Sequence, residues 1–163
     1  MLTLAKSPRL TLKKSSYNTR HVTYAQVYSS LVKQTRHIDS MTAGFINAAV
    51  ELAHDCSFDA NHSLIDDSTR KMVHDFVAEF YHANYADLMA HYNTGLYFWH
   101  DWVGVGSDLF VTVAGHGCGF WEHETGKPLA DWLEDYGCEF YACNDEEDTL
   151  EGYGCYIWKY GKA

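Results

Sequence analysis

The chain has 163 residues, of which 47% are hydrophobic and 15% aromatic, so it can form one packed domain and is too apolar to be disordered. Its 12 lysines and arginines against 22 acidic residues give a net charge of -10. No stretch reaches the roughly 18 apolar residues of a membrane helix, and the N-terminus lacks the apolar core of a signal peptide. We therefore expect a cytoplasmic protein that does not enter a membrane.

The charge is divided unevenly along the chain. Residues 1–36 carry seven basic residues and no acid, whereas residues 37–163 carry 22 acids and five bases, so +7 is followed by -17. One interpretation is that the basic segment lies on the acidic body; another is that the acidic body repels nucleic acid and suits a basic partner. The first 36 residues also resemble an organellar transit peptide, because they are rich in Arg, Lys and Ser.

The N-terminal third predicts an arm followed by two helices. Residues 1–22 contain Pro8 and have no clear period, which predicts a flexible basic arm before a single domain at 23–163. Thr23, with Gln26 three residues later, predicts a capping box and a helix to about residue 36. Ser40 predicts the start of a second helix, which should end before the polar loop at 59–63.

The middle of the chain predicts two further helices. Asp66 or Asp67 should cap the first of them, and a short helix at 85–91 should stop at the Asn93-Thr94-Gly95 turn. Apolar residues at helical spacing predict the buried side of the first helix. They are Met72, Val73, Phe76, Val77, Phe80 and Tyr81.

Two strands are predicted next. Gly104 and Gly106 should interrupt any regular element, and the β-branched and aromatic residues of 108–113 predict a strand. Residues 120–122 predict a second short strand that pairs back on the first. The glycine-rich stretch 115–119 would then be a wide hairpin connection.

The C-terminal part predicts a helix and a hairpin. Residues 126–128 place Pro in a first helical turn, and Gly137 stands where a C-terminal cap belongs. Strands are predicted at 138–143 and 153–158, around the acidic turn at 144–148. With the preceding strands this gives a ββαββ order, and the fold class predicted is α+β, with N-terminal helices packed on a small antiparallel sheet.

The most distinctive stretch is Gly115-His116-Gly117-Cys118-Gly119-Phe120-Trp121. Together with the preceding Asp108-Leu109-Phe110-Val111-Thr112 and the following Glu122, it resembles a DFWxTRxGHGxGFWD motif in uncharacterised small proteins encoded by tailed bacteriophages. The resemblance covers roughly residues 66–158. The chain departs from the motif at Val113-Ala114 and places Cys118 at a variable position. The resemblance implies a phage-encoded accessory protein and no particular reaction.

The same stretch could hold a metal ion. His116, Cys118 and His123 lie within eight residues, and thiolate and imidazole are the ligands that zinc prefers. The candidates for a fourth ligand are Cys138, Cys143 and Cys155. The alternative is structural: the histidine bonds to a backbone carbonyl, and the cysteine packs as a small apolar side chain.

A nucleophilic site is a further alternative. Cys118 could be activated by His116, His123 or His100 and oriented by the carboxylate of Asp108. These residue types suit nucleophilic catalysis, but the types alone are weak evidence in a chain with ten histidines.

The interpretation that we favour is a non-catalytic one, with no cofactor. We expect a small acidic phage protein that binds a host macromolecule, with inhibition of a host defence or nucleic-acid enzyme as its specific form. The alternative is a small metal-binding protein or hydrolase centred on His116, Cys118 and His123. The residues predicted to bind the partner are His116, Cys118, Phe120, Trp121, Asp145, Glu146, Glu147 and Asp148.

Overall fold

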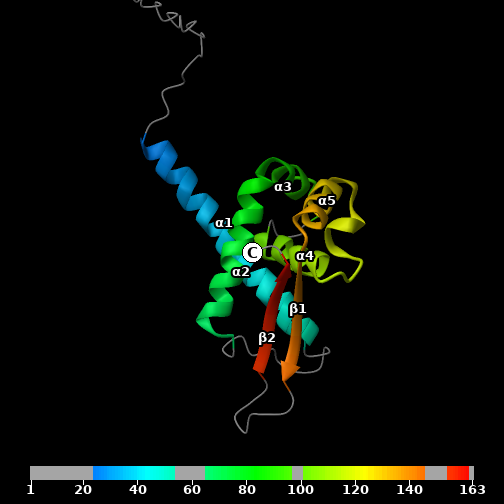
Figure 1. Ribbon diagram of the computed structural model, residues 1–163. Helices are drawn as coiled ribbons and strands as arrows, with labels where there is room; N and C mark the ends of the chain where they lie inside the picture. Colours follow the sequence, from blue (N-terminus) through cyan, green and yellow to red (C-terminus); the bar gives the residue numbers. More distant parts are fainter. Residues whose placement is uncertain (1–23, 54–64, 97–100, 146–153, 162–163) are drawn as a thin grey trace, which may run out of the picture.

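The protein is mostly helical. The computed structural model describes residues 24–53, 65–96, 101–145 and 154–161, with the backbone alone at 24, 25, 53, 141–145 and 154–161 (Figure 1). In chain order the elements are α1 (Tyr24–Ala53), α2 (Asp67–Ala83), α3 (Tyr85–Tyr92), α4 (Trp102–Val113), η2 (Gly119–Glu122), η3 (Glu124–Gly126), α5 (Lys127–Tyr136), β1 (Cys138–Asp145) and β2 (Gly154–Gly161). The predicted α+β fold is therefore wrong, because the described strands form one hairpin beside a helical body.

The first helix is one continuous element of 30 residues, where the sequence predicted two helices. Ser40 lies inside α1 and does not cap a new helix. The nearby Thr35 and Thr42 hydroxyls donate to the carbonyl oxygens of Leu31 and Ile38, at 3.0 and 2.8 Å, so these polar side chains bond within the helix. The predicted cap at Thr23 and the arm at 1–22 lie outside the described residues.

The predicted strand at 108–113 is wrong, because these residues form the second half of α4. Asp101 caps this helix by accepting a hydrogen bond from the backbone N–H of Val103 at 2.9 Å. Buried residues recur at three- and four-residue intervals and leave little of the helix polar: Trp102, Val105, Gly106, Leu109, Phe110, Thr112 and Val113. A helix buried on most sides has the apolar, β-branched content that also predicts a strand.

The glycines of α4 do not interrupt the helix; one of them allows close contact with α1. A Cβ on Gly106 would lie 2.0 Å from the carbonyl oxygen of Met41, and a Cβ on Gly44 would lie 1.9 Å from that of Val103. No side chain fits at such distances, so the two backbones meet at a pair of glycines. The Ser107 hydroxyl donates to the Gly44 carbonyl at 3.2 Å across the same contact.

Helices α2, α3 and α5 agree with the sequence predictions. Asp66 caps α2 by accepting a hydrogen bond from the N–H of Thr69 at 2.6 Å. Pro128 lies in the first turn of α5, and Gly137 ends that helix in the left-handed conformation with φ 68°. The start of α2 and the end of α5 are set by residues at the helix ends themselves, which is why the sequence alone predicts these two ends.

An aromatic cluster joins the hairpin to the helices. Strands β1 and β2 pair antiparallel, with Cys138 opposite Gly161. Phe140 on β1 is fully buried, and its ring centroid lies 5.0 Å from that of Phe45 on α1 and 4.7 Å from that of Phe76 on α2. The hairpin therefore shares the core of the helical body through β1. The strands at 138–143 and 153–158 were predicted, although residue 153 is not described.

Candidate functional site

The glycine-rich stretch terminates α4. Gly115 has φ 73°, and its N–H donates to the carbonyl of Thr112 at 3.2 Å. The N–H of His116 donates to the carbonyl of Val111 at 3.1 Å. These two bonds, with a left-handed glycine between them, form a Schellman cap, which satisfies carbonyls that the helix end would leave unpaired.

The chain then turns back onto α4 at Gly119. The Thr112 hydroxyl donates to the carbonyl of Asp108 at 2.6 Å and accepts from the N–H of Phe120 at 3.0 Å. A Cβ on Gly119, whose φ is 81°, would lie 2.5 Å from that hydroxyl oxygen. The third glycine of the motif is thus required by close approach, and the hairpin connection predicted here is wrong.

Phe120 anchors the returning chain in the core. It begins no strand: residues 119–122 form the 3₁₀ turn η2. The Phe120 ring is fully buried, stacked on Phe80 at 5.8 Å and edge-on to His91 at 5.4 Å between centroids. Gly126 passes closely over it, since a Cβ there would lie 2.4 Å from the Phe120 carbonyl oxygen. The side chain of Phe120 is therefore not exposed to a partner in this structure.

The three side chains proposed as metal ligands have different surroundings. His116 is exposed, while Cys118 and His123 are partly buried. The centroid of the His123 ring lies 5.9 Å from that of His91. Within the described ranges, no three His, Cys, Asp or Glu side chains are grouped as metal ligands. His100 lies outside the described residues, as do the side chains of Cys143 and Cys155.

His91 is a buried polar residue that the sequence analysis did not single out. Its Nδ1 lies 2.8 Å from the hydroxyl oxygen of Thr125, so α3 is tied to the turn before α5. Burial lowers the pKa of His91, and the neighbouring His123 lowers it further. The position could have been found from spacing, because His91 follows the buried Leu88 by three residues and so shares its helix face.

The exposed Trp121 belongs to a stretch of the chain that is rich in exposed acids. The Trp121 side chain is 44% exposed, beside the buried Phe120. Between residues 121 and 139 the chain has one base, Lys127, and six acids, all of them exposed. The acids are Glu122, Glu124, Asp131, Glu134, Asp135 and Glu139. We call these six residues and Trp121 the acidic surface; α5 contributes three of the acids, on the side away from its buried Leu129 and Leu133.

The predicted acidic turn is largely outside the described residues. Asp145 is the last residue of β1, and its backbone pairs with Gly154. Glu146, Glu147 and Asp148 are not described. The acidic surface of residues 121–139 was not singled out in the sequence, because its acids are spread over two turns, a helix and the start of β1 and form no run.

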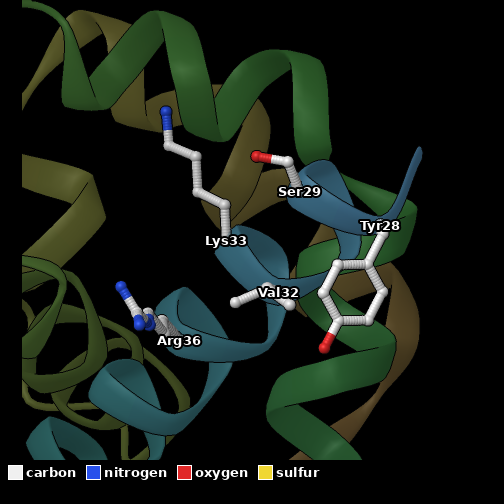
Figure 2. A pocket seen from close by; sticks show the side chains of 5 residues that line it. All are labelled: Tyr28, Ser29, Val32, Lys33 and Arg36. Carbon is white, nitrogen blue, oxygen red and sulfur yellow. The ribbon is translucent and has the colours of Figure 1, made fainter. Parts of the chain in front are cut away.

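A second exposed feature lies on α1, whose N-terminal part extends away from the other helices (Figure 1). We call residues 24–36 the outer half and residues 37–53 the inner half. The outer half has a hollow lined by Tyr28, Ser29, Val32, Lys33 and Arg36, shown in Figure 2. Its charged groups are both basic, in contrast to the acidic surface.

Comparison with known proteins identifies no relative. The chain matches no protein-family model, no curated protein and no solved structure. The resemblance to tailed-phage proteins stays a prediction that rests on residues 108–122. Across the described helices, none combines the length and the apolar character that a bilayer crossing demands.

Proposed function

We propose that this protein is a phage accessory protein that binds a basic macromolecule of the host cell through the acidic surface. The observation that carries the proposal is the exposed Trp121 on η2, together with exposed carboxylates on η2, η3 and α5, three elements that contact one another. Large aromatic side chains that are exposed in the free protein are frequent anchors of protein interfaces. The surrounding carboxylates supply charge complementarity to a basic partner.

A protein that binds nucleic acid is the partner class that fits best. Such a protein carries Lys and Arg where phosphates bind, and an acidic surface can occupy that groove in competition with the nucleic acid. The net charge of -10 gives long-range attraction to such a groove and repulsion from nucleic acid itself. Inhibition by occupancy requires no catalytic group in the phage protein.

The test is affinity capture from host lysate with three variants of the chain. Trp121→Ala removes the anchor and Glu134→Lys reverses one charge of the acidic surface, while Glu51→Lys makes the same charge change on α1 as a matched control. The captured protein should be displaced by added duplex DNA. Its affinity for Trp121→Ala should fall by at least about 30-fold, the equivalent of about 2 kcal/mol for a central aromatic anchor.

Two results would contradict the proposal. One is equal capture by the wild type, Trp121→Ala and Glu134→Lys, because the acidic surface would then have no part in binding. The other is a captured protein that duplex DNA does not displace. A loss of binding with Glu51→Lys that equals the loss with Glu134→Lys would show an effect of net charge alone.

A further inference from the structure

Two side chains of the exposed turn at residues 121–125 lie against one buried imidazole. The hydroxyl oxygen of Thr125 lies 2.8 Å from Nδ1 of His91, and the ring centroid of His123 lies 5.9 Å from that of His91. The His91 ring is fully buried, whereas Thr125 is exposed and His123 partly buried. A change in the charge of His91 therefore acts on both contacts between the turn and α3.

The two ends of the turn are anchored independently of His91. The N–H of Phe120 donates to the Thr112 hydroxyl at 3.0 Å, and the Phe120 ring is fully buried. Gly126 is buried over the carbonyl of Phe120 and directly precedes α5. Because the anchors stand at its two ends, the turn can separate from α3 while α4 and α5 stay folded.

Helix α3 has further contacts of its own with the body of the protein. Leu88 is fully buried, and the Tyr92 ring stacks on Trp102 of α4 with centroids 4.5 Å apart. These contacts do not involve the turn. In a separation of the two elements, α3 therefore stays in place and the turn moves.

We propose that His91 is an acid-sensitive latch: when it binds a proton, the turn at residues 121–125 separates from α3. In the closed form a protonated His91 would hold its charge away from water, which is unfavourable. It would also lie beside the ring of His123, which gains a positive charge in the same range of pH. Separation admits water to His91 and moves the two rings apart, so proton uptake favours the open form.

The electrostatic surroundings of His91 agree with this direction. Burial lowers the pKa of His91, and the neighbouring His123 lowers it further, so the closed form holds the neutral ring. Helix α3 contacts η3, α2 and α5. The other acid- or base-bearing residues of α3, of the turn and of the adjoining helix ends are exposed: His82, Asp87, Glu122, Glu124 and Lys127. The latch is therefore closed above the ordinary histidine pKa of 6.5 and opens as the pH falls below it.

The latch goes beyond the proposed function. Trp121 lies in the turn, so opening would change the position of the partner-binding anchor, and this consequence alone rests on the proposed function. The latch itself is tested on the chain without a partner, so its failure is separate from failure of the proposed function.

The experiment is amide hydrogen exchange of the full chain between about pH 7.5 and about pH 5, with rates corrected for the intrinsic pH dependence of exchange. The N–H of Gly126 reports the turn, because it donates to the carbonyl of His123 at 2.9 Å. The N–H of Ala114, which donates to Phe110 at the end of α4, is the reference. Protection of Gly126 should fall at least about tenfold, since the uptake of one proton changes the opening equilibrium about tenfold per pH unit. Protection of Ala114 should stay within about twofold.

Three variants separate His91 from general effects of acid. His91→Asn keeps a polar atom near the position of Nδ1 and binds no proton, so the protection of Gly126 should no longer change with pH. Thr125→Val removes the hydroxyl with little change of shape, so it should lower the protection of Gly126 at about pH 7.5. His116→Gln replaces the exposed histidine of the glycine-rich stretch as a matched control and should behave as the wild type.

Equal protection of Gly126 at both pH values in the wild type would overturn the proposal. An equal loss at Ala114 would also overturn it, because the whole chain would then be opening, and so would a wild-type pH dependence in His91→Asn. The wild type gives a further result that needs no variant. The midpoint of the loss of protection should coincide with the proton uptake of His91 seen in the NMR signals of its ring, and a different midpoint contradicts the latch.

Discussion

The two halves of α1 carry the same apolar pattern in different surroundings. Phe45 in the inner half is fully buried, whereas Leu31 in the outer half is 56% exposed, although the two lie on the same side of the helix. The change occurs within a few residues: Arg36 is exposed, His37 is partly buried and Ile38 is buried. The pattern within a helix therefore indicates which side can be buried, and the neighbouring elements decide how far along the helix burial extends.

Contacts from α2 and α4 mark where the inner half begins. The His37 ring stacks on Trp102 with centroids 4.2 Å apart and an interplanar angle of 16°. Its Nδ1 lies 3.0 Å from the hydroxyl oxygen of Tyr81 on α2. C-terminal to this point, Gly44 and Gly106 bring the backbones of α1 and α4 together. The outer half lies N-terminal to these contacts, which is why the same side of the helix is exposed there.

The largest expected effect comes from replacing a buried apolar side chain of the inner half with alanine, compared with the same replacement in the outer half. Phe45→Ala should lower the free energy of unfolding by about 3–5 kcal/mol, because it removes a ring that packs on Phe76, Phe110 and Phe140. Leu31→Ala should change it by less than about 0.5 kcal/mol, since the side chain is already exposed. Urea unfolding of the two variants and the wild type measures both changes in the free energy of unfolding. Equal losses would contradict the contrast between the halves.

A smaller effect is expected from adding a methyl group at the helix contact. Gly106→Ala should destabilise the protein by about 1–3 kcal/mol, because its Cβ would meet the Met41 carbonyl oxygen. Alanine normally favours a helix over glycine by about 1 kcal/mol, so the sign itself tests the close approach. Ser30→Ala, in the exposed outer half, is the control and should stabilise slightly. Stabilisation by Gly106→Ala in the same urea experiment would show that α1 and α4 are not in contact there.

The sequence predicted those elements whose signals are local. Asp66 at the start of α2 and Gly137 at the end of α5 act on the neighbouring residues, and both were identified. The continuity of α1 and the helical state of residues 108–113 were missed, because both depend on packing between elements distant in sequence. Gly106 illustrates the reason: a helix-weakening residue is favourable where another backbone is within contact distance.

The candidate site could be predicted in part for the same reason. Glycines 115, 117 and 119 all have positive φ, which glycine adopts without the steric cost of a Cβ, so the residue type agrees with the turns found here. The role of Thr112, which joins α4 to the N–H of Phe120, depends on the returning chain and has no signature in the sequence. The acidic surface was missed because its acids are far apart in the sequence, and η2, η3 and α5, which carry five of them, come into contact only in the folded chain.

The smallest expected effect is a dependence of stability on pH, which should arise in the body of the protein and not in the outer half of α1. Burial and then His123 lower the pKa of His91, and burial and then Lys33 lower that of His37, so both rings favour the neutral form when folded. Their contribution is fully present above the unfolded pKa of 6.5 and is lost as the pH falls below it, because the unfolded chain then binds the additional protons. Residues 26–36 contain no His, Asp or Glu, so acidification should destabilise the body without a titration in the outer half.

Urea midpoints at about pH 7.5 and about pH 5.5 measure this difference. His91→Gln should reduce it, because glutamine binds no proton when the chain unfolds. Leu88→Ala, which removes a buried apolar side chain from the same face of α3, should lower both midpoints and leave the difference between them unchanged. An undiminished pH dependence in His91→Gln would mean that His91 is not held neutral by its burial against Phe120 and Thr125.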